Sequence, residues 1–437
     1  MKIAIIGCGY VFDVYMATWH RHPNLEILGV TDIDRSRVEV VTHFYRLAAY
    51  SCNEEVYADK RVELVVNLTS IDSHYEVTKF ALSAGKHVYS EKPLATSMDQ
   101  VNDLIALAEQ KGLRLSCAPS NVLSDTIQTM WKAVLDGAVG DVRIIYAEFD
   151  DNPIYLMEPE GWTNRTGAPW PYKHEYESGC TYEHVAYHLT WLCAMFGPVK
   201  SVTAFSKQTI PDKTNSQLDP ADTPDFSVAC LLFQSGMVAR VTCSIAVPYN
   251  HRMQIVGNKG MIWADTYRHY RCPVFLEKFT KVTMNARKAY SVRVNTFLQR
   301  LLGVNGRRVK LLKLIPPGAN TVRSENSRWW HSGDLFRRIL KYQVGQQDKA
   351  IGIAELVDAL ENERIPFPSH DFTRHICELT IAIQGAGTHS GTIQIKSSFK
   401  PIKPLPATME ATVNYDSSGY KVLDNLLGRI VDRLHKH

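Results

Sequence analysis

The stretch Lys-Ile-Ala-Ile-Ile-Gly-Cys-Gly at residues 2–9 decides the fold class. Residues 2–6 are almost continuously apolar, which is typical of a strand buried on both faces of a parallel sheet. Gly7 and Gly9 then frame a tight turn, and a helical pattern follows through residues 17–19. A strand, a glycine turn and a helix in this order predict the first unit of a doubly wound α/β sheet.

The glycine turn carries part of the fingerprint of dinucleotide-binding folds. Gly7 suits the tight turn, Gly9 lets the backbone approach a pyrophosphate, and the N-terminus of the next helix receives the charge. The third glycine is missing and Phe12 takes its place, so we expect this helix to pack on the sheet through a bulky side chain. Tyr10 lies in the turn and is predicted to contact the cofactor.

A second strand, residues 25–31, ends at Asp32, at a distance from Gly9 that suits a carboxylate bound to an adenosine ribose. No arginine stands directly beside Asp32 to receive a 2′-phosphate, which favours NAD over NADP, although Arg35 and Arg37 lie close by. The alternative for Asp32 is a helix N-cap or turn aspartate.

Strand and helix patterns then repeat as far as Asn121. We expect strands at residues 62–68, 87–90 and 114–118, and helices at residues 73–84 and 98–110. Polar residues after the first of these strands are predicted cofactor contacts, namely Thr69, Ser70 and His74, although a single histidine is more often structural. Asn121 closes this domain; it is predicted to contact the cofactor and is a weaker candidate for lining the pocket.

The turn Glu91-Lys92-Pro93 follows the strand at residues 87–90. Pro93 keeps Lys92 out of the α region, so the lysine leaves the strand end in a fixed direction. Open α/β sheets bind their ligands at this edge, where an amine can hydrogen-bond a substrate hydroxyl and stabilise an alkoxide. Glu91 is placed to orient the lysine or to contact the cofactor. The alternative is a solvated lysine in a turn.

From residue 122 onward the pattern becomes that of an antiparallel sheet. After a helix at residues 123–136, apolar and polar residues alternate, as in a sheet with one buried face. Such strands are expected at residues 142–149, 201–206, 226–233, 237–246, 253–256 and 261–263. The predicted fold class is α/β: a Rossmann domain over residues 1–121, then an α+β domain over residues 122–437 with a large, mostly antiparallel open sheet.

The order and spacing of these motifs resemble the glucose-fructose oxidoreductase, inositol dehydrogenase and rhizopine catabolism (Gfo/Idh/MocA) family. The resemblance covers nearly the full chain and is weakest over residues 264–350. It implies an NAD(P)-dependent oxidoreductase that transfers hydride between the cofactor and a secondary alcohol or ketone of a sugar, nucleotide sugar or inositol. It also implies a homo-oligomer, a dimer or tetramer, built through the exposed face of the second sheet.

Two other functions occur on the same fold, an NAD-retaining glycosidase and a non-catalytic nucleotide-binding sensor. An intact Lys92 argues against the sensor, which needs no positioned acid or base.

Members of the family typically carry an aspartate and, four residues later, a histidine on the helix after a glycine-rich segment. In this chain Glu183 and Tyr187 hold these positions. Because an i, i+4 pair lies on one helix face, both side chains can point into one pocket. The resemblance therefore implies proton transfer by Tyr187 beside Lys92. His184 and His188 compete for a role at the substrate, and packing in the core is the alternative for Tyr187.

Aromatic and polar residues crowd the loop before this helix. Trp170, Tyr172 and Lys173 are predicted to line the substrate pocket, since aromatic rings with interspersed polar groups suit stacking against sugars. Anchoring of a long loop is the alternative.

The composition predicts a cytoplasmic protein. Hydrophobic residues make up 45% and charged residues 22% of the chain, as in ordinary soluble proteins. No apolar run is long enough to span a bilayer, and the N-terminus shows no signal-peptide pattern. The nine cysteines include no C-x-x-C pair and no regular spacing with histidines, so we expect reduced thiols and no metal site.

Residues 278–324 contain lysines and arginines but no carboxylate. This bias predicts contact with an anion or with the anionic surface of a membrane, and the alternative is a solvated insertion or an oligomer contact. Residues 297–304 and 309–315 are apolar and basic and are expected to form surface helices. Nucleic acid is not an expected partner, because no recognised binding module accompanies the charge.

Overall fold

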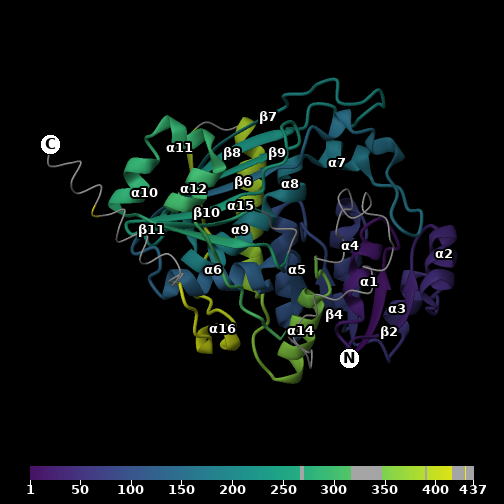
Figure 1. The fold of residues 1–437 in the computed structure, drawn as a ribbon. Helices are drawn as coiled ribbons and strands as arrows, with labels where there is room; N and C mark the ends of the chain where they lie inside the picture. Colours follow the sequence, from purple (N-terminus) through teal and green to yellow (C-terminus); the bar gives the residue numbers. More distant parts are fainter. Residues whose placement is uncertain (266–269, 316–346, 389–390, 416–428, 430–437) are drawn as a thin grey trace, which may run out of the picture.

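The computed structural model describes residues 1–265, 270–315, 347–388, 391–415 and 429. In these residues the chain forms two sheets, and the N-terminal elements lie at one side of the molecule while the strands of the second sheet fill the other (Figure 1). This confirms the predicted pairing of a parallel α/β domain with a larger sheet.

The first sheet is parallel throughout and has the strand order β2-β1-β3-β4-β5. Its strands are β1 (Lys2–Ile6), β2 (Glu26–Thr31), β3 (Leu64–Asn67), β4 (His87–Ser90) and β5 (Leu115–Cys117). Every predicted strand of this domain forms, because runs of buried apolar residues mark strands covered on both faces.

Helices cover both faces of this sheet. They are α1 (Phe12–Trp19) and α2 (Arg35–Tyr45) on one face, and α3 (Asn53–Ala58), α4 (Ile71–Ser83) and α5 (Met98–Gln110) on the other. Phe12 is fully buried, with its ring centroid 5.8 Å from that of Tyr45. The expected bulky contact in place of a third glycine is therefore confirmed.

One further helix of the first sheet comes from far along the chain. In α14 (Ile351–Glu361), Ile353 and Leu356 are buried in the same cluster as Ile3 and Ile5 of β1. A boundary near residue 121 thus divides the strands of the two sheets but not all of their helices. The boundary itself stays a prediction.

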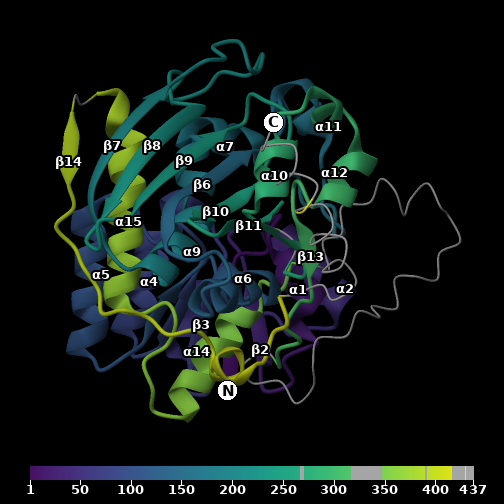
Figure 2. The same cartoon turned by 60° about the vertical axis from the view of Figure 1, so that its left-hand side comes forward.

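The second sheet has the order β13-β12-β11-β10-β6-β9-β8-β7-β14, and Figure 2 labels all of these strands except β12, in this order. Among the described strands of this second sheet, only β6 and β9 pair in parallel, and all other pairs are antiparallel. The strands are β6 (Val142–Asp150), β7 (Val199–Lys207), β8 (Phe226–Phe233), β9 (Val238–Ser244), β10 (Met253–Gly257), β11 (Gly260–Ala264), β12 (Val274–Lys278), β13 (Arg307–Val309) and β14 (Thr392–Gln394). The prediction of a mostly antiparallel sheet is confirmed.

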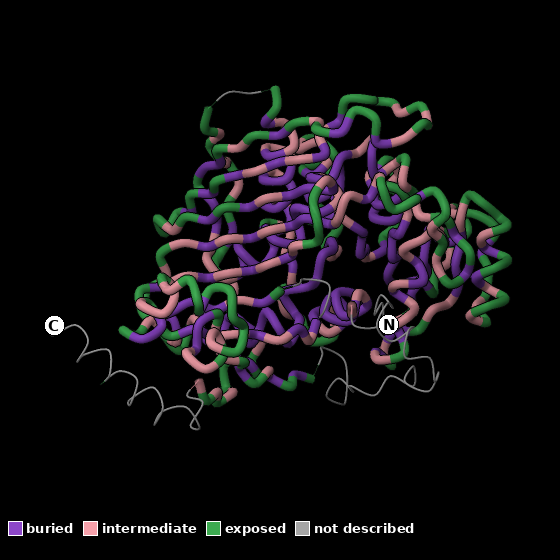
Figure 3. Tube along the Cα trace, turned by 45° about the horizontal axis from the view of Figure 1, so that its top comes forward, coloured by how far each residue is buried: buried purple, intermediate pink, exposed green. Residues whose placement is uncertain are grey.

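One face of the second sheet carries its core. The helices packed there are α6 (Asp125–Leu135), α8 (Cys180–His184), α9 (Ala186–Phe196) and α15 (His370–Gln384). The short helices α7 (Tyr172–Ser178) and α16 (Pro406–Glu410) also belong to this domain. Along the strands, buried residues alternate with half-buried and exposed ones (Figure 3), so the other face is open.

The basic segment is described as far as residue 315, and its residues 316–324 lie outside the described parts. It forms α10 (Lys281–Ala286), α11 (Tyr290–Val294) and α12 (Thr296–Leu302), which confirms a surface helix within residues 297–304. The helix expected at residues 309–315 is wrong, because Val309 is buried and pairs with Val274 as part of β13. Contact of this segment with an anion or a membrane stays a prediction.

Some of this segment's charge is used inside the fold. Arg287 Nε donates to Oε1 of the buried Glu277 at 2.9 Å.

In the described parts of the chain, no helix has the length and apolar character needed to cross a membrane.

Candidate functional site

The predicted cofactor residues gather at one edge of the first sheet. Each set follows the carboxyl end of a strand: Gly7, Gly9 and Tyr10 after β1, Asp32 after β2, Thr69 and Ser70 after β3, Glu91 and Lys92 after β4, and Asn121 after β5. The carboxyl ends of parallel strands form the edge where open α/β sheets bind ligands.

The glycine turn and Asp32 form one hydrogen-bonded unit. Gly7 has a φ of +105°, and a Cβ there would lie 2.5 Å from the carbonyl of Leu68, so no other residue fits. A Cβ on Gly9 would meet nothing within 4 Å, which leaves room for a ligand to approach the backbone. Cys8 N donates to Asp32 Oδ2 at 2.6 Å. These residues fit the pyrophosphate and the adenosine ribose of a dinucleotide.

The two arginines near Asp32 are already engaged. Arg35 Nη1 donates to the carbonyl oxygens of residues 50 and 51, each at 2.9 Å. Arg37 donates to Cys8 O at 3.2 Å and, through Nη2, to Thr166 Oγ1 at 2.8 Å. Thr166 belongs to a loop of the second domain, so Arg37 links that loop to the glycine turn.

The same loop also contacts Tyr10. Asn164 Nδ2 donates to the Tyr10 carbonyl at 3.1 Å, and Thr166 N donates to Asp13 Oδ2 at 2.7 Å. The glycine turn is therefore held from outside by the second domain.

Lys92 meets Glu183 where the two domains face each other. Its Nζ donates to Glu183 Oε2 at 2.5 Å, with only 11% and 13% of the two side chains exposed. Burial disfavours the ammonium, but Glu183, followed by Tyr187 and Glu91, raises the pKa of Lys92. Burial likewise opposes the carboxylate, but Lys92 lowers the pKa of Glu183. Both groups are therefore charged, and Lys92 is a donor of hydrogen bonds.

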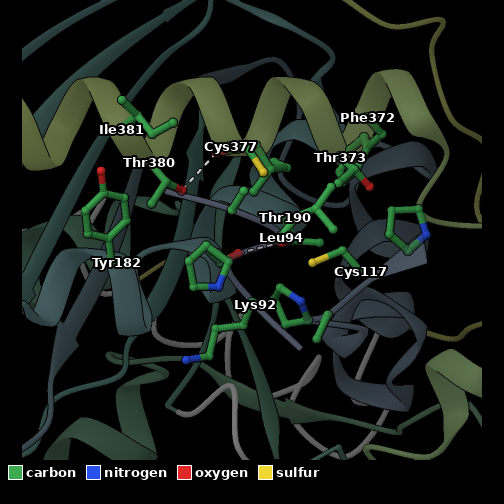
Figure 4. A pocket seen from close by; sticks show the side chains of 17 residues that line it. Lys92, Leu94, Cys117, Tyr182, Thr190, Phe372, Thr373, Cys377, Thr380 and Ile381 are labelled. Carbon is green, nitrogen blue, oxygen red and sulfur yellow. Dashed lines mark hydrogen bonds between the residues drawn. The ribbon is translucent and has the colours of Figure 1, made fainter. Parts of the chain in front are cut away.

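An apolar pocket lies behind Lys92. It has a volume of about 20 Å³ and is lined by the aliphatic part of Lys92 together with Leu94, Phe372 and Ile376. Figure 4 shows that the Lys92 amine points away from α15, which covers this pocket. The pocket thus supports the stem of the lysine, and the amine faces the polar groups.

Tyr187, on α9, joins this polar group. Tyr187 is only 8% exposed. Asn121 Nδ2 donates to the backbone carbonyl of Tyr187 at 2.8 Å. Asn121 therefore holds the start of α9 in place, and its contact with a ligand stays a prediction. The phenol oxygen lies 3.5 Å from Lys349 Nζ.

Lys349 and Tyr15 are two site residues that the sequence did not reveal. Lys349 Nζ donates to Glu91 Oε1 at 2.7 Å, and Tyr15 Oη donates to the same oxygen at 2.8 Å. Burial opposes the charge on Glu91, but Lys349 and Lys92 lower its pKa to about 2. Lys349 stands in the segment with the weakest family resemblance, so no motif marked it.

The two histidines predicted at the substrate differ in their surroundings. His184 Nε2 pairs with Glu175, a buried carboxylate that the sequence did not single out, and its ring stacks on Phe149 with centroids 4.6 Å apart. His188 is fully buried, with Nε2 bonded to Glu148 O at 2.7 Å and Nδ1 accepting from Trp191 Nε1 at 2.9 Å. The arrangement of His188 supports a role in the core and not at a substrate.

The remaining predicted residues have mainly structural contacts. His74 is buried between the carbonyl oxygens of Pro93, at 2.6 Å, and Thr69, at 3.1 Å, so it ties the lysine turn to the end of β3. Thr69 Oγ1 donates to Asn67 Oδ1 at 2.7 Å, while Ser70 is exposed at the start of α4.

The aromatic loop is anchored as well. Trp170 packs against Trp162 with ring centroids 5.0 Å apart, and Tyr172 Oη lies 3.0 Å from Ser216 Oγ. Lys173 is exposed. Contact of these residues with a substrate stays a prediction.

Two family models match the chain. The model described as "Oxidoreductase family, NAD-binding Rossmann fold" matches residues 1–118. The model described as "GFO/IDH/MocA C-terminal domain" matches residues 127–263. Together they span the glycine turn, the lysine turn and the helices α8 and α9, which carry Glu183 and Tyr187.

Individual proteins are similar to this chain over more than half of its length. A trans-1,2-dihydrobenzene-1,2-diol dehydrogenase of Mus musculus is 23% identical over 276 residues, 61% of this chain and 76% of its own. A scyllo-inositol 2-dehydrogenase (NADP(+)) of Bacillus subtilis is 26% identical over 230 residues, 52% of this chain and 58% of its own. The WlbA dehydrogenase of Bordetella pertussis, solved with NADH and UDP-GlcNAcA, has a TM-score of 0.62 at 16% identity over 91% of this chain and 98% of that chain. At this identity the last likeness shows the fold alone.

Proposed function

Since the chain belongs to the Gfo/Idh/MocA family of NAD(P)-dependent dehydrogenases acting on CH–OH groups, we propose that it interconverts a secondary alcohol and a ketone on a sugar, nucleotide sugar or inositol. The observation that carries this proposal is the charged pair of Lys92 and Glu183 at the carboxyl ends of the parallel strands. It puts a fixed ammonium beside a phenol, at the edge where the fold binds nucleotides.

The cofactor would be held by the turn of residues 7–9 and by Asp32, and Thr69 and Ser70 line the same edge. When bound, its nicotinamide accepts or donates hydride at the substrate carbon. We favour NAD over NADP, because Asp32 would repel a 2′-phosphate and both Arg35 and Arg37 are engaged elsewhere.

Lys92 would stabilise the substrate oxygen. An ammonium held by Glu183 donates a hydrogen bond to the hydroxyl and becomes more favourable as negative charge grows on that oxygen. Because the pKa of Lys92 is raised, the lysine keeps its charge and does not act as the base.

Tyr187 would move the proton. In oxidation the proton of the substrate hydroxyl would pass to the phenolate oxygen of Tyr187, and in reduction the Tyr187 phenol would return it. Asn121 fixes the backbone of Tyr187 at 2.8 Å, so that the phenol keeps its place beside Lys92.

The substrate class is supported by what the relatives act on. The names of two of them describe ring compounds with neighbouring hydroxyl groups, a dihydrobenzenediol and scyllo-inositol, and a third structure contains a nucleotide sugar. A buried site with several charged hydrogen-bonding groups suits a polyhydroxylated ring.

The open face of the second sheet is the proposed contact between copies of the chain.

The test is turnover with a panel of sugars, inositols and nucleotide sugars, measured through the absorbance of reduced nicotinamide. Lys92→Met should lower kcat by about 100-fold or more, since the mutant lacks the donor to the developing oxyanion. Binding of NADH, followed by fluorescence titration, should be kept within about threefold.

Lys60→Met is the matched control, because Lys60 is exposed on the same domain. It should behave as the unchanged protein. Full activity of Lys92→Met on a substrate of the panel would overturn the proposed role of the lysine.

A further inference from the structure

Lys349 is a second buried lysine beside Tyr187, and it comes from the segment just before α14. Its Nζ lies 2.7 Å from Glu91 Oε1, 3.5 Å from Tyr187 Oη and 5.5 Å from the centre of the Tyr15 ring. Only 13% of its side chain is exposed. None of the motifs that mark the site includes this residue.

The chemistry of these groups fixes the direction of their hydrogen bonds. An ammonium donates and cannot accept, so Tyr187 Oη accepts from Lys349 and its own proton must point elsewhere. Glu91 is ionised, with its pKa lowered to about 2 by the lysines against the effect of burial, and it already accepts from Lys349 and Tyr15. The Tyr187 proton is thereby directed away from Lys349.

The charge of Lys349 is as important as its geometry. Burial disfavours the ammonium, but Glu91 and then Tyr187 raise the pKa of Lys349, so it stays charged. Tyr187 also acts electrostatically on Lys92, so the phenol interacts with two ammonium groups, of which Lys349 lies 3.5 Å from its oxygen. Two cations at one oxygen stabilise negative charge on it in a site of low dielectric constant.

Two of the other titratable groups around this cluster are neutral. Burial raises the pKa values of Tyr15 and Tyr89, so both remain neutral phenols. Besides Glu91 and Lys92, the titratable groups facing the cluster from the packed elements are Tyr15, Tyr89, Tyr270, Glu175 and Glu183.

We propose that Lys349 is a positioning residue that holds Tyr187 for proton transfer and stabilises its oxygen when the proton has left. The proposal rests on the proposed function of Tyr187 in this reaction. It adds that Lys349, a residue outside both family motifs, positions the Tyr187 phenol and stabilises negative charge on its oxygen.

The test compares pH profiles of kcat for the unchanged enzyme, Lys349→Met, Lys349→Arg and Tyr187→Phe, in the direction of alcohol oxidation. Lys349→Met should lower kcat by about 10- to 100-fold near neutral pH. Its low-pH limb should move upward by about one pH unit or more, so that activity recovers in alkaline buffer. The KM for the alcohol should be unchanged, and Lys349→Arg should restore most of the rate.

The double variant Lys349→Met with Tyr187→Phe separates this proposal from the proposed function. If Lys349 acts through Tyr187, the double variant should be no slower than Tyr187→Phe alone. Full activity of Tyr187→Phe would overturn the proposed role of Tyr187. A slow Tyr187→Phe together with an unshifted profile for Lys349→Met would overturn only the role of Lys349.

Loss of Lys349 also leaves Glu91 buried without its partner, which can unfold the protein. The variant Lys349→Met with Glu91→Gln removes both charges and avoids this effect. It should show the same upward shift of the low-pH limb. A normal profile in this variant would mean that Lys349 serves only to neutralise Glu91, and it would overturn the proposal.

Discussion

Asp32 is the residue to which we assign the choice between the two nicotinamide cofactors. Its carboxylate accepts from Cys8 N at 2.6 Å and from Asp34 N at 2.8 Å, so the turn holds it at the strand end. A fixed carboxylate binds the ribose hydroxyls of NAD and repels the phosphate of NADP.

Asp32→Ser should therefore lower the ratio of kcat/KM for NAD to kcat/KM for NADP. We expect a decrease of about 10- to 100-fold, because a hydrogen bond to a charged group contributes about 1.5–3 kcal/mol. Initial rates with each cofactor measure it. Asp34→Ser is the control. Asp34 is exposed, and the hydroxyl of a serine in its place can still cap the start of α2. An unchanged ratio in Asp32→Ser would contradict the assignment.

At the residue scale, the sequence predicted groups that lie in local motifs. Gly7, Asp32 and Lys92 each stand next to the strand that positions them, so their neighbours in sequence suffice to identify them. Lys349 and Glu91 are 258 residues apart, and only folding brings them together. His188 lies beside Tyr187 in sequence, but its ring turns into the core because a helix rotates by about 100° per residue.

At the scale of elements, α15 is attached to the second sheet through a neutral histidine. His375 Nε2 accepts from Val199 N at 2.9 Å, and Nδ1 lies 3.1 Å from Ser397 O. Burial lowers the pKa of His375 to about 4. Below the ordinary value of about 6.5 the unfolded chain binds a proton that the folded one does not, so stability is lost as the pH falls from about 6.5 to about 4.

His375→Gln should flatten this dependence. An amide can accept from Val199 N and donate to Ser397 O, so the contacts are kept while the titration is removed. Urea unfolding near pH 7 and near pH 4.5 measures how much stability the protein loses between these pH values. This loss should be smaller in His375→Gln than in the unchanged protein, by up to about 3 kcal/mol. His43→Gln, on the exposed side of α2, should leave the dependence unaltered. An equal loss in both variants would exclude this role for His375.

The bounds of elements followed from local patterns, while their order in a sheet did not. The alternation of residues 226–233 marks β8 because one face of the strand is buried. The parallel pairing of β6 with β9, and the pairing of β14 at the far edge, join segments distant in sequence. Val309 shows the same limit, since it ends β13 by pairing with β12, and residues 310–315 form neither the expected helix nor a strand.

At the scale of the whole molecule, the open face of the second sheet is the surface available for self-association. Phe205 is 52% exposed, Leu232 38% and Val238 39%, on neighbouring strands of that face. Exposed apolar groups gathered on one face are typical of an interface.

Phe205→Glu combined with Leu232→Glu should convert the proposed dimer or tetramer into a monomer, because charges there would be buried without partners. Sedimentation velocity measures the change. The control is Phe80→Glu with Leu135→Glu, residues 56% and 52% exposed on α4 and α6. Equal sedimentation of both double variants and the unchanged protein would reject this interface.

The return of α14 to the first sheet also bears on how the chain is made and how it can be divided. All strands of the Rossmann sheet are synthesised by residue 117. The helix α14, which covers part of one face of this sheet, begins only at residue 351. Until then, apolar surface around Ile3 and Ile5 lacks its cover, so nascent chains stopped in between are expected to need chaperones. A nucleotide-binding fragment for expression, or a chimera with another dehydrogenase, must therefore carry residues 350–361 along with the N-terminal segment.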